Sequence, residues 1–428
     1  MGSVRARIFV FPLSILVVAM VFIAGCGGGG DGNGSTVKNA KKLEASQAKG
    51  ASGNVTWCIG KDTSGSFKQV VDAHNRSSQV NVKLIELPTS ADVQRTQQVQ
   101  RLRAKSSECD VLGMDVIWTA EYAAQGWLYD VSSLINDRRG DFIPSTAETA
   151  KFENKYWAVP FNTNAGFIYY RKSQAQQAPS SWEALYNQAK QDDGLIYQGM
   201  RYEGLTVNFL ELLYSAGGKV VSDDGKSSEI NSPQAKKVLS FMVDGIKNGA
   251  VPKAVLTYDE QKTRTAFEAN KGTFMRNWPY AYALAKDSKI ANDFGISTFP
   301  SFGGNKGAGV VGGYNLGIST YSKNPDGALE FADFATSPEA QKLMMTKASL
   351  PAVLTQTYSD PDVRKALPFA PQLLKAVQQA QARPVSPVYP QITEAIFKNV
   401  YDALSGDTSP DAALKQADDD ISKALKTF

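Results

Sequence analysis

The N-terminus of this chain has the layout of an export signal, which separates its first residues from the part that folds. Residues 1–7 carry two arginines and no acid, and residues 8–23 form an apolar run broken only by Pro12 and Ser14. A basic start followed by a short apolar stretch is typical of a secretory signal that is cleaved from the mature protein. We therefore predict a signal peptide over residues 1–25 and a folded body outside the cytoplasm.

The apolar run ends in Ile23-Ala24-Gly25-Cys26, which resembles the lipobox of bacterial lipoproteins. That resemblance implies an acylated Cys26 and an anchor on the outer face of the cell membrane. The alternative is a stop-transfer helix with an incidental cysteine, but the run is shorter than the roughly 20 residues that a spanning helix needs. Residues 27–34 are almost entirely glycine and residues 35–53 are polar without an apolar period. We predict a flexible tether over residues 26–53.

The body that begins near Asn54 is too long for one ordinary hydrophobic core, so the sequence predicts two lobes. Removal of the signal takes away two of the 46 basic residues and none of the 42 acidic ones, which leaves a net charge of about +2. Because no basic stripe is present, nucleic acid is not an expected partner.

Two cysteines, Cys58 and Cys109, remain if Cys26 is acylated. In an exported protein such a pair indicates a disulfide bond, and the alternative is two buried thiols. His74 is the single histidine, and we expect it on the surface of a helix. Histidine-dependent catalysis and a histidine metal site are therefore not expected, and neither a metal nor a cofactor is predicted.

The first hundred residues of the body alternate between strand and helix patterns. Apolar strands are predicted at residues 55–59, 80–85 and 109–112, and helical spacing occurs at residues 67–74 and 93–102. This order is typical of a parallel α/β sheet, in which ligands bind beyond the carboxyl ends of the strands. The segments 62–66 and 114–118 are the places where a ligand site is predicted.

A second lobe is predicted to begin near Asn164, with a strand at residues 166–170. A helix follows that we expect to start with a capping box made by Ser180 and Glu183. Three later helices begin with Ser-Pro, at Ser232, Ser337 and Ser409. Serine as the cap and proline in the first turn is a common helix start, and the apolar stripes of these helices indicate core.

Seven segments resemble the successive blocks of extracellular sugar-binding proteins of ABC importers. They are GMDVIWTAEYAAQGWL (113–128), AVPFNTNAGFIYYRK (158–172), YEGLTVNFLELLYSAGG (202–218), FMRNWPYAYAL (274–284), GGYNLGIS (312–319), LPAVLTQTYSDP (350–361) and ARPVSPVYP (382–390). They occur in the family's order over nearly the whole mature chain. Within that group the chain is most similar to the trehalose/maltose-binding branch, which includes actinobacterial trehalose-binding lipoproteins.

The resemblance implies a two-lobed, periplasmic-binding-protein-like α/β fold of type II, with the ligand in a cleft and crossing strands as hinges. Lobe 1 is expected to comprise residues 54–162 and about 313–365, and lobe 2 residues 163–312 and about 366–428. The implied ligand is a disaccharide of the trehalose or maltose type, and the implied protein partners are the transmembrane subunits of an ABC permease. A monomer that touches the membrane only through its lipid is expected.

Ten ligand-binding residues are carried over from the resemblance. The carboxylate of Asp115 is expected to accept hydrogen bonds from sugar hydroxyls, the Trp278 ring to stack on a pyranose, and Arg383 to donate its N–H fork to vicinal hydroxyls. The full set is Asp62, Asp115, Asn162, Asn164, Glu260, Trp278, Tyr280, Gly313, Tyr314 and Arg383. At Asn162 and Tyr314 the chain departs from some relatives, which suggests a pocket shaped for a different disaccharide or linkage.

Each of these residues also has a purely structural interpretation. Asp115 would cap the helix that starts at Val116, Trp278 would pack in the core, and Arg383 would pair with a surface acid. The pair Tyr202-Glu203 would serve only to start a helix, and the alignment around Asp62 is ambiguous by one or two residues.

Two other classes of function remain open from the sequence. An exported glycoside hydrolase would need two flanking carboxyl groups, for which Asp115 and Glu260 are the candidates. A carbohydrate receptor without a transport role would use the same lobes. No hydrolase signature is present, so the sequence predicts a binding protein and not an enzyme.

Overall fold

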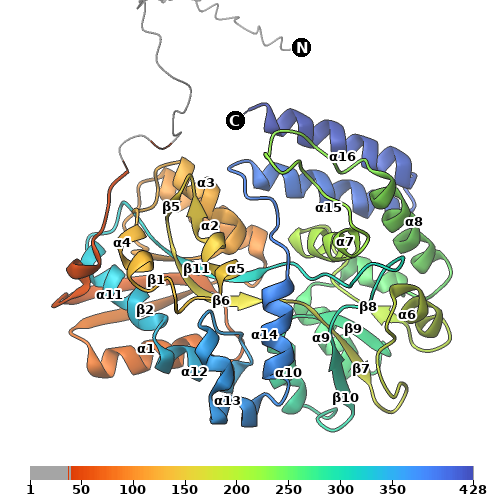
Figure 1. Ribbon diagram of the computed structural model, residues 1–428, viewed down its shortest axis with the longest axis horizontal. Helices are drawn as coiled ribbons and strands as arrows, with labels where there is room; N and C mark the ends of the chain where they lie inside the picture. Colours follow the sequence, from red (N-terminus) through yellow and green to blue (C-terminus); the bar gives the residue numbers. More distant parts are fainter. Residues whose placement is uncertain (1–36, 38–39, 428) are drawn as a thin grey trace, which may run out of the picture. The chain divides into compact units, whose positions relative to one another are not determined.

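Two separate β-sheets organise the part of the chain that this computed structural model describes, which is residue 37 and residues 40–427 (Figure 1). These residues all fall within one compact unit, Val37–Phe428. The predicted signal peptide, Cys26 and, of the predicted tether, residues 27–36, 38 and 39 lie outside the described residues.

The first sheet has five strands in the order β2-β1-β3-β11-β6. Its strands are β1 (Gly53–Gly60), β2 (Val80–Leu87), β3 (Val111–Asp115), β6 (Val159–Asn164) and β11 (Gly312–Ile318). β1 runs parallel to β2 and β3, and β11 runs antiparallel to both β3 and β6. The helices α1 (Ser66–Ser77) and α2 (Ala91–Arg103) connect the parallel strands, so the predicted alternation of strand and helix is confirmed.

The second sheet has four strands in the order β10-β7-β9-β8. Its strands are β7 (Phe167–Arg171), β8 (Leu195–Ile196), β9 (Phe274–Asn277) and β10 (Phe294–Ser297). A small pair, β4 (Lys151–Phe152) and β5 (Lys155–Tyr156), stands apart from both sheets.

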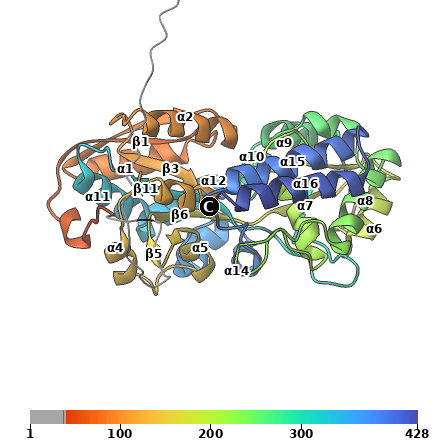
Figure 2. The ribbon, with the colours of Figure 1, turned by 90° about the horizontal axis from the view of Figure 1, so that it is seen from above.

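Helices surround each sheet and enclose a separate hydrophobic core, which defines two lobes that lie side by side (Figure 2). The first lobe carries α3 (Thr119–Ala124), α4 (Ser132–Asp137), α5 (Pro144–Thr149), α11 (Pro325–Ala335) and α12 (Pro338–Ala348). The second carries α6 (Trp182–Ala189), α7 (Glu203–Ser215), α8 (Pro233–Lys247), α9 (Glu260–Glu268), α10 (Tyr280–Lys286), α15 (Tyr389–Ser405) and α16 (Pro410–Leu425).

The chain crosses between the lobes more than once. β6 continues into β7 through Ala165 and Gly166, and the segment after β10 returns to β11. The C-terminal crossing contains α13 (Pro361–Ala366) and α14 (Ala370–Gln379). Just before it, in α12, the adjacent residues Met344 and Met345 pack in the first and the second core, respectively. A cleft between lobes that share several crossings is the architecture predicted from the sequence.

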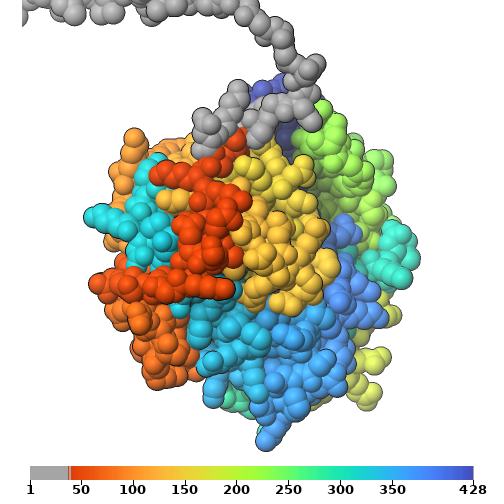
Figure 3. Space-filling view, turned by 60° about the vertical axis from the view of Figure 1, so that its left-hand side comes forward, coloured from red at the N-terminus to blue at the C-terminus, as the bar shows by residue number. Residues whose placement is uncertain are grey.

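The prediction of a flexible tether up to residue 53 is wrong for residues 40–53. Leu43 is buried in the first core, and its N–H donates to the carbonyl of Asp130 at 2.9 Å. A short 3₁₀ helix, Ala45–Ala48, packs against α11 and α4, and these residues lie across the surface of the first lobe in Figure 3. Leu43, alanines that pack against the same core and a few backbone bonds fix this segment, although it has no apolar period.

The expectation that His74 lies on the surface is also wrong. His74 shares the buried face of α1 with Phe67, Val70 and Val71, and its side chain is fully buried. Its Nε2 lies 2.6 Å from a carboxylate oxygen of Glu330 on α11, which satisfies the ring inside the core.

Most helix starts agree with the sequence, with one exception. Ser232, Ser337 and Ser409 accept N–H bonds at the starts of α8, α12 and α16. At α6 the cap is Ser181 and not Ser180, and Glu183 accepts the N–H of Gly303 in place of closing a capping box. The carbonyl of Ser180 instead accepts from Ser301, and this pairing moves the cap by one position.

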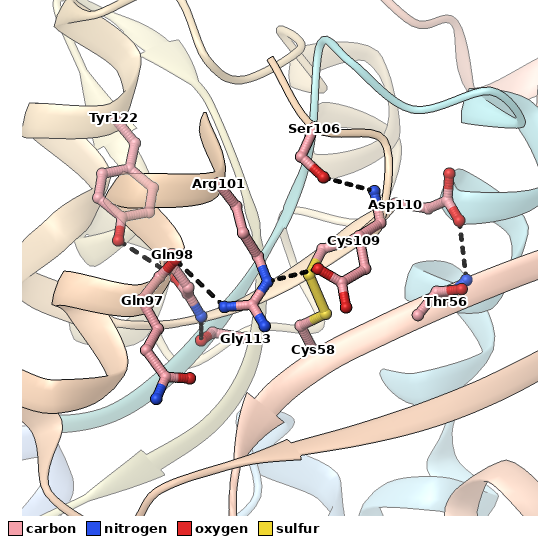
Figure 4. The surroundings of a disulfide bond; sticks show 11 residues. Thr56, Cys58, Gln97, Gln98, Arg101, Ser106, Cys109, Asp110, Gly113 and Tyr122 are labelled. Atoms are coloured by element: carbon pink, nitrogen blue, oxygen red, sulfur yellow. Dashed lines mark hydrogen bonds and ion pairs between the residues drawn. A yellow bond between two sulfur atoms is a disulfide. The ribbon is translucent and has the colours of Figure 1, made fainter. Parts of the chain in front are cut away.

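A disulfide bond joins Cys58 on β1 to Cys109, two residues before β3 (Figure 4). Beside it the carboxylate of Asp110 accepts the N–H of Thr56, and Gln98 of α2 donates to the carbonyl of Gly113. The pairing predicted from the sequence is therefore present, and it links two strands whose carboxyl ends point to the same edge of the sheet.

Candidate functional site

A cavity of about 180 Å³ lies where the carboxyl ends of β1 and β3 meet the second lobe. Both lobes contribute to its wall. All ten residues predicted from the sequence line it: Asp62, Asp115, Asn162, Asn164, Glu260, Trp278, Tyr280, Gly313, Tyr314 and Arg383. Sequence positions more than 300 residues apart thus come together at one place.

Asp62 organises the loop that follows β1. One carboxylate oxygen accepts from the N–H and hydroxyl of Ser64, and the other accepts from the hydroxyl of Ser66 and the N–H of Phe67. These four bonds hold the start of α1. Asp62 therefore shapes the cavity wall, while most of its hydrogen-bonding capacity is used within the protein.

Asp115 ends β3 and has two structural partners. Its Oδ1 caps the 3₁₀ turn Val116–Trp118 by accepting the N–H of Ile117 at 3.2 Å, and it also accepts from Arg383 Nη2 at 2.8 Å. The predicted cap is thus present in a residue that also lines the cavity.

Asn162 and Gly313 fix the backbone of the two antiparallel strands at the cavity. Asn162 Oδ1 accepts the N–H of Tyr314 at 2.8 Å, next to a register shift between β6 and β11. Gly313 has a φ of +113°, and a Cβ there would lie 2.2 Å from the carbonyl oxygen of Asn162. Only glycine fits this position. The next residue, Tyr314, lines the cavity, and its hydroxyl donates a hydrogen bond to Gln94 of α2.

The side-chain amide oxygen of Asn164, Oδ1, is buried and has no hydrogen-bond partner among the described residues. A buried polar atom without a partner costs free energy, so such an atom at a cavity wall marks a position where a ligand donor would be stabilising. Asn164 lies at the end of β6, next to the crossing into the second lobe.

Trp278 and Tyr280 form the aromatic wall of the second lobe. The guanidinium of Arg276 lies 4.0 Å from the Trp278 ring centroid, and Arg276 is itself held by Glu211. A Cβ on Gly312 would come within 3.0 Å of the same ring, so a glycine there lets the ring approach β11. The Trp278 side chain packs partly on the second core and also lines the cavity.

Glu260 begins α9 and its carboxylate accepts the hydroxyl of Tyr202 at 2.6 Å. Burial raises the pKa of Glu260, while the bond from Tyr202 acts in the opposite direction. Gln261 of the same helix donates to the hydroxyl of Tyr280, which connects the aromatic wall to this helix.

Arg383 is buried and does not present a free fork to the cavity, which corrects the sequence expectation. Its Nη1 donates to Glu203 at 2.7 Å, and its Nη2 donates to Asp115 and to the carbonyl of Val311. Its Nε is buried without a partner among the described residues. The alternative of pairing with a surface acid is also wrong, since both carboxylates lie within the molecule.

Glu203 is the main functional candidate that the sequence reasoning undervalued. Its sequence context indicates only a residue that starts a helix, but its carboxylate accepts from Arg383, Tyr389 and Thr393. Burial raises the pKa of Glu203 to about 7, with Arg383 opposing that shift. α7 is buried on all sides, and its sequence without a polar face is the signal from which a buried acid could have been predicted.

The other cavity residues lie at strand ends, in loops and in helices without a distinctive sequence pattern, and of these only Thr63 falls in the predicted segment 62–66. They are Gly60, Lys61, Thr63, Phe67, Thr89, Ser90, Ala91, Gly204, Val207, Asp259, Gln261, Gly312 and Leu350. The wall as a whole combines aromatic rings with carboxylates, amides and two cations, which suits a ligand that has both apolar faces and many hydroxyl groups.

In residue 37 and residues 40–427, no three histidine, cysteine or acidic side chains gather as metal ligands. Across the same described ranges, none of the helices combines the length and apolar character that crossing a membrane requires.

Two lobes that enclose a polar and aromatic cavity define a ligand-binding protein of the periplasmic type. Residues 60–342 match the model of the bacterial extracellular solute-binding protein family, and this chain belongs to that family.

Individual relatives agree with this assignment. A protein of Deinococcus radiodurans named "Probable ABC transporter-binding protein" is 32% identical over 379 residues, which is 83% of this chain and 89% of that protein. A mannitol-binding protein of Pseudomonas aeruginosa is 25% identical and covers 76% of this chain and 82% of its own length.

Among solved structures, the maltose-bound MalE3 of T. maritima superimposes with a TM-score of 0.82. It is 32% identical and covers 87% of this chain and 99% of its own. The two-lobed fold predicted from the sequence is thereby confirmed.

Proposed function

We propose that this protein captures a disaccharide of the maltose or trehalose type and delivers it to the transmembrane subunits of an ABC permease. The observation that carries the proposal is the cavity wall itself. It sets the rings of Trp278, Tyr280 and Tyr314 beside the unpartnered amide oxygen of Asn164 and the carboxylate of Asp115. The maltose-bound relative of known structure supports a sugar of this size.

The ten cavity residues named from the sequence are proposed as the ligand contacts, with different roles. The aromatic rings would cover the C–H faces of the sugar, and Asn164 and Glu260 would accept hydrogen bonds from its hydroxyl groups. Asp62 and Asn162 would act mainly by holding the loops around the ligand, since their side chains already bond to the protein. No turnover of the sugar is expected.

A thermal-shift panel tests the choice of ligand. Maltose, trehalose, sucrose, mannitol, longer glucans and glucose would each be added to the purified mature protein. A ligand that binds only the native state raises the melting temperature as its concentration exceeds the Kd. We expect the largest shift with maltose or trehalose, and a panel without any shift would refute a sugar ligand of this class.

Closure of the lobes is proposed as the binding motion, with the crossings near Asn162 and Gly312 as hinges. The lobes are proposed to comprise residues 54–162 with about 313–365, and residues 163–312 with about 366–428. Small-angle scattering is expected to show a smaller radius of gyration at saturating sugar, because the ligand contacts both lobes only when they are closed. An unchanged radius with bound sugar would exclude this motion.

Anchoring through an acylated Cys26 is proposed for the cellular location. The change Cys26→Ser would remove the thiol that accepts the lipid, so the protein is expected to leave the membrane fraction and lose incorporation of a labelled fatty acid. Cys58→Ser serves as the control, because that cysteine lies in the disulfide and its change leaves the lipid site intact.

A further inference from the structure

We propose that Glu203 is a positioning residue of the binding pocket, which orients Arg383 for the ligand and makes sugar affinity depend on the ionisation of its carboxylate. This inference rests on the proposed function of the pocket and concerns how the same site is regulated. It follows from the arrangement of three charged groups that come from three different segments of the chain.

The carboxylate of Glu203 is held from several sides. Its Oε1 accepts from Arg383 Nη1 at 2.7 Å and from the hydroxyl of Tyr389 at 2.8 Å, and its Oε2 accepts from the hydroxyl of Thr393 at 2.5 Å. Glu203 and Arg383 are only 4% and 5% exposed. A charged hydrogen bond in such a buried place is stronger than one at the surface and fixes geometry more firmly.

These bonds determine which part of Arg383 is left for a ligand. Both terminal nitrogens are engaged, Nη1 by Glu203 and Nη2 by Asp115 and the carbonyl of Val311. The remaining nitrogen, Nε, is buried, unpartnered among the described residues, and part of a side chain that lines the cavity. We assign Nε as the donor to a sugar oxygen, and its direction depends on the bond between Glu203 and Nη1.

The same group of charges connects the two lobes. Asp115 belongs to β3 of the first lobe, Glu203 begins α7 of the second, and Arg383 lies in the crossing before α15. Asp92 of α2 adds a contact from the first lobe, since its carboxylate accepts the N–H of Glu203 at 3.3 Å. Loss of charge on Glu203 would therefore weaken its bond to Arg383, which also donates to Asp115 of the first lobe.

The charged and titratable groups that face Glu203 explain why it changes its charge near neutrality. They come from every element packed around it: Asp92 from α2, Asp115 from β3, Arg383 from the crossing, and Tyr389 and Thr393 from α15. Burial is the main reason that the pKa of Glu203 rises to about 7, and Arg383 and the Thr393 hydroxyl limit the rise. Asp92, whose pKa is also raised by burial, adds negative charge next to it.

The test is the Kd of the mature protein for maltose and for trehalose, measured by titration calorimetry between pH 5.5 and 8.5. The Kd of the sugar that binds is expected to rise about tenfold as the pH falls through 7, because the protonated carboxyl no longer makes a charged bond to Arg383. Glu203→Gln should bind about tenfold more weakly than the wild type at pH 8.5 and show little further change at low pH.

A second variant separates positioning from a purely structural role. Thr393→Val removes a donor that lowers the pKa of Glu203, so the midpoint of the pH profile is expected to move to higher pH. Glu229→Gln, at an exposed position away from the cavity, should keep the wild-type profile. If Glu203→Gln fails to fold, the shift in Thr393→Val still decides the question.

A wild-type Kd that is constant from pH 5.5 to 8.5, a Glu203→Gln protein with full affinity, or a Thr393→Val profile without a shift would each overturn the inference. These outcomes differ from a failure of the proposed function. In that case neither sugar would bind to the wild-type protein at any pH.

Discussion

The Trp278 side chain has two different neighbours, the guanidinium of Arg276 and the cavity. Arg276 lies 4.0 Å from the ring centroid and is buried with Glu211, so the ring rests on a fixed support. A rigid aromatic surface loses little conformational entropy when a sugar stacks on it. This support is the reason to expect a large share of the affinity from Trp278.

We predict that Trp278→Ala weakens sugar binding about thirtyfold, which corresponds to about 2 kcal/mol of lost stacking and burial. Titration calorimetry with the sugar that stabilises the wild type measures the change. Trp278→Phe is the matched control and should recover part of the affinity, because it restores a smaller aromatic surface. Equal affinity of the alanine variant and the wild type would contradict the stacking role.

At the residue scale, the location of the site could be predicted but the hydrogen-bond partners could not. Asp115, Asn164 and Trp278 all line the cavity as expected. Arg383 differs, because its partners Glu203 and Asp115 lie 180 and 268 positions away in the chain. The family resemblance assigns the fork to the ligand, and neither it nor a local sequence pattern contains information on contacts of that range.

At the scale of elements, covalent and polar links join parts of the first lobe that are distant in sequence. The disulfide between Cys58 and Cys109 connects β1 to the start of β3 across a sequence separation of 51 residues. Closing a loop of this length in the unfolded chain removes conformational entropy that would otherwise favour unfolding.

We expect the double change Cys58→Ala and Cys109→Ala to lower the free energy of unfolding by about 4 kcal/mol, the value for a loop of this length. Guanidinium denaturation of the mature protein, followed by circular dichroism, measures the loss. The reduced wild type should unfold at a denaturant concentration similar to that of the double variant. An unchanged midpoint in both would show that the bond contributes nothing to stability.

The buried contact between α1 and α11 gives a second prediction for this lobe. His74→Ala removes a ring that bonds to Glu330 and packs edge-on against Phe331 and Phe334. The cost is expected to be about 2–4 kcal/mol, since a cavity forms and the Glu330 carboxylate loses a buried partner. Lys68→Ala, on the exposed face of α1, should change stability by less than about 0.5 kcal/mol in the same guanidinium denaturation.

Local sequence patterns predict which segments form helices, but they do not fix the residue at which every helix starts. The Ser-Pro starts of α8, α12 and α16 are local signals, and all three hold. The start of α6 depends instead on a backbone pairing between Ser180 and Ser301, which are 121 positions apart. The packed segment at residues 40–53 is a similar case, because Leu43 is fixed by Asp130 and not by a pattern of its own.

At the scale of the whole molecule, the buried acids make stability depend on pH. The folded pKa of Glu203 is about 7 and its ordinary value is 4.5, so between these values the folded protein binds more protons than the unfolded chain. The stabilising effect of the proton is complete below about pH 4.5, and it is lost as the pH rises through 7.

We therefore predict that the free energy of unfolding falls by up to about 3 kcal/mol between pH 5 and pH 8 because of Glu203. Urea denaturation at a series of pH values measures this slope. Glu203→Gln should flatten it, while Glu229→Gln should keep it. A wild-type slope of the opposite sign over this range would contradict the assignment of a raised pKa.

The attachment of residues 40–53 to the first lobe affects how the protein would be held at a membrane. If Cys26 carries the lipid, residues 27–36 connect it to Val37, which is buried in the first core, and ten residues span at most about 35 Å. The lobe that holds Leu43 would then stay within that distance of the lipid. The connection would limit the distance of the first lobe from the bilayer directly, and that of the second lobe only through the first.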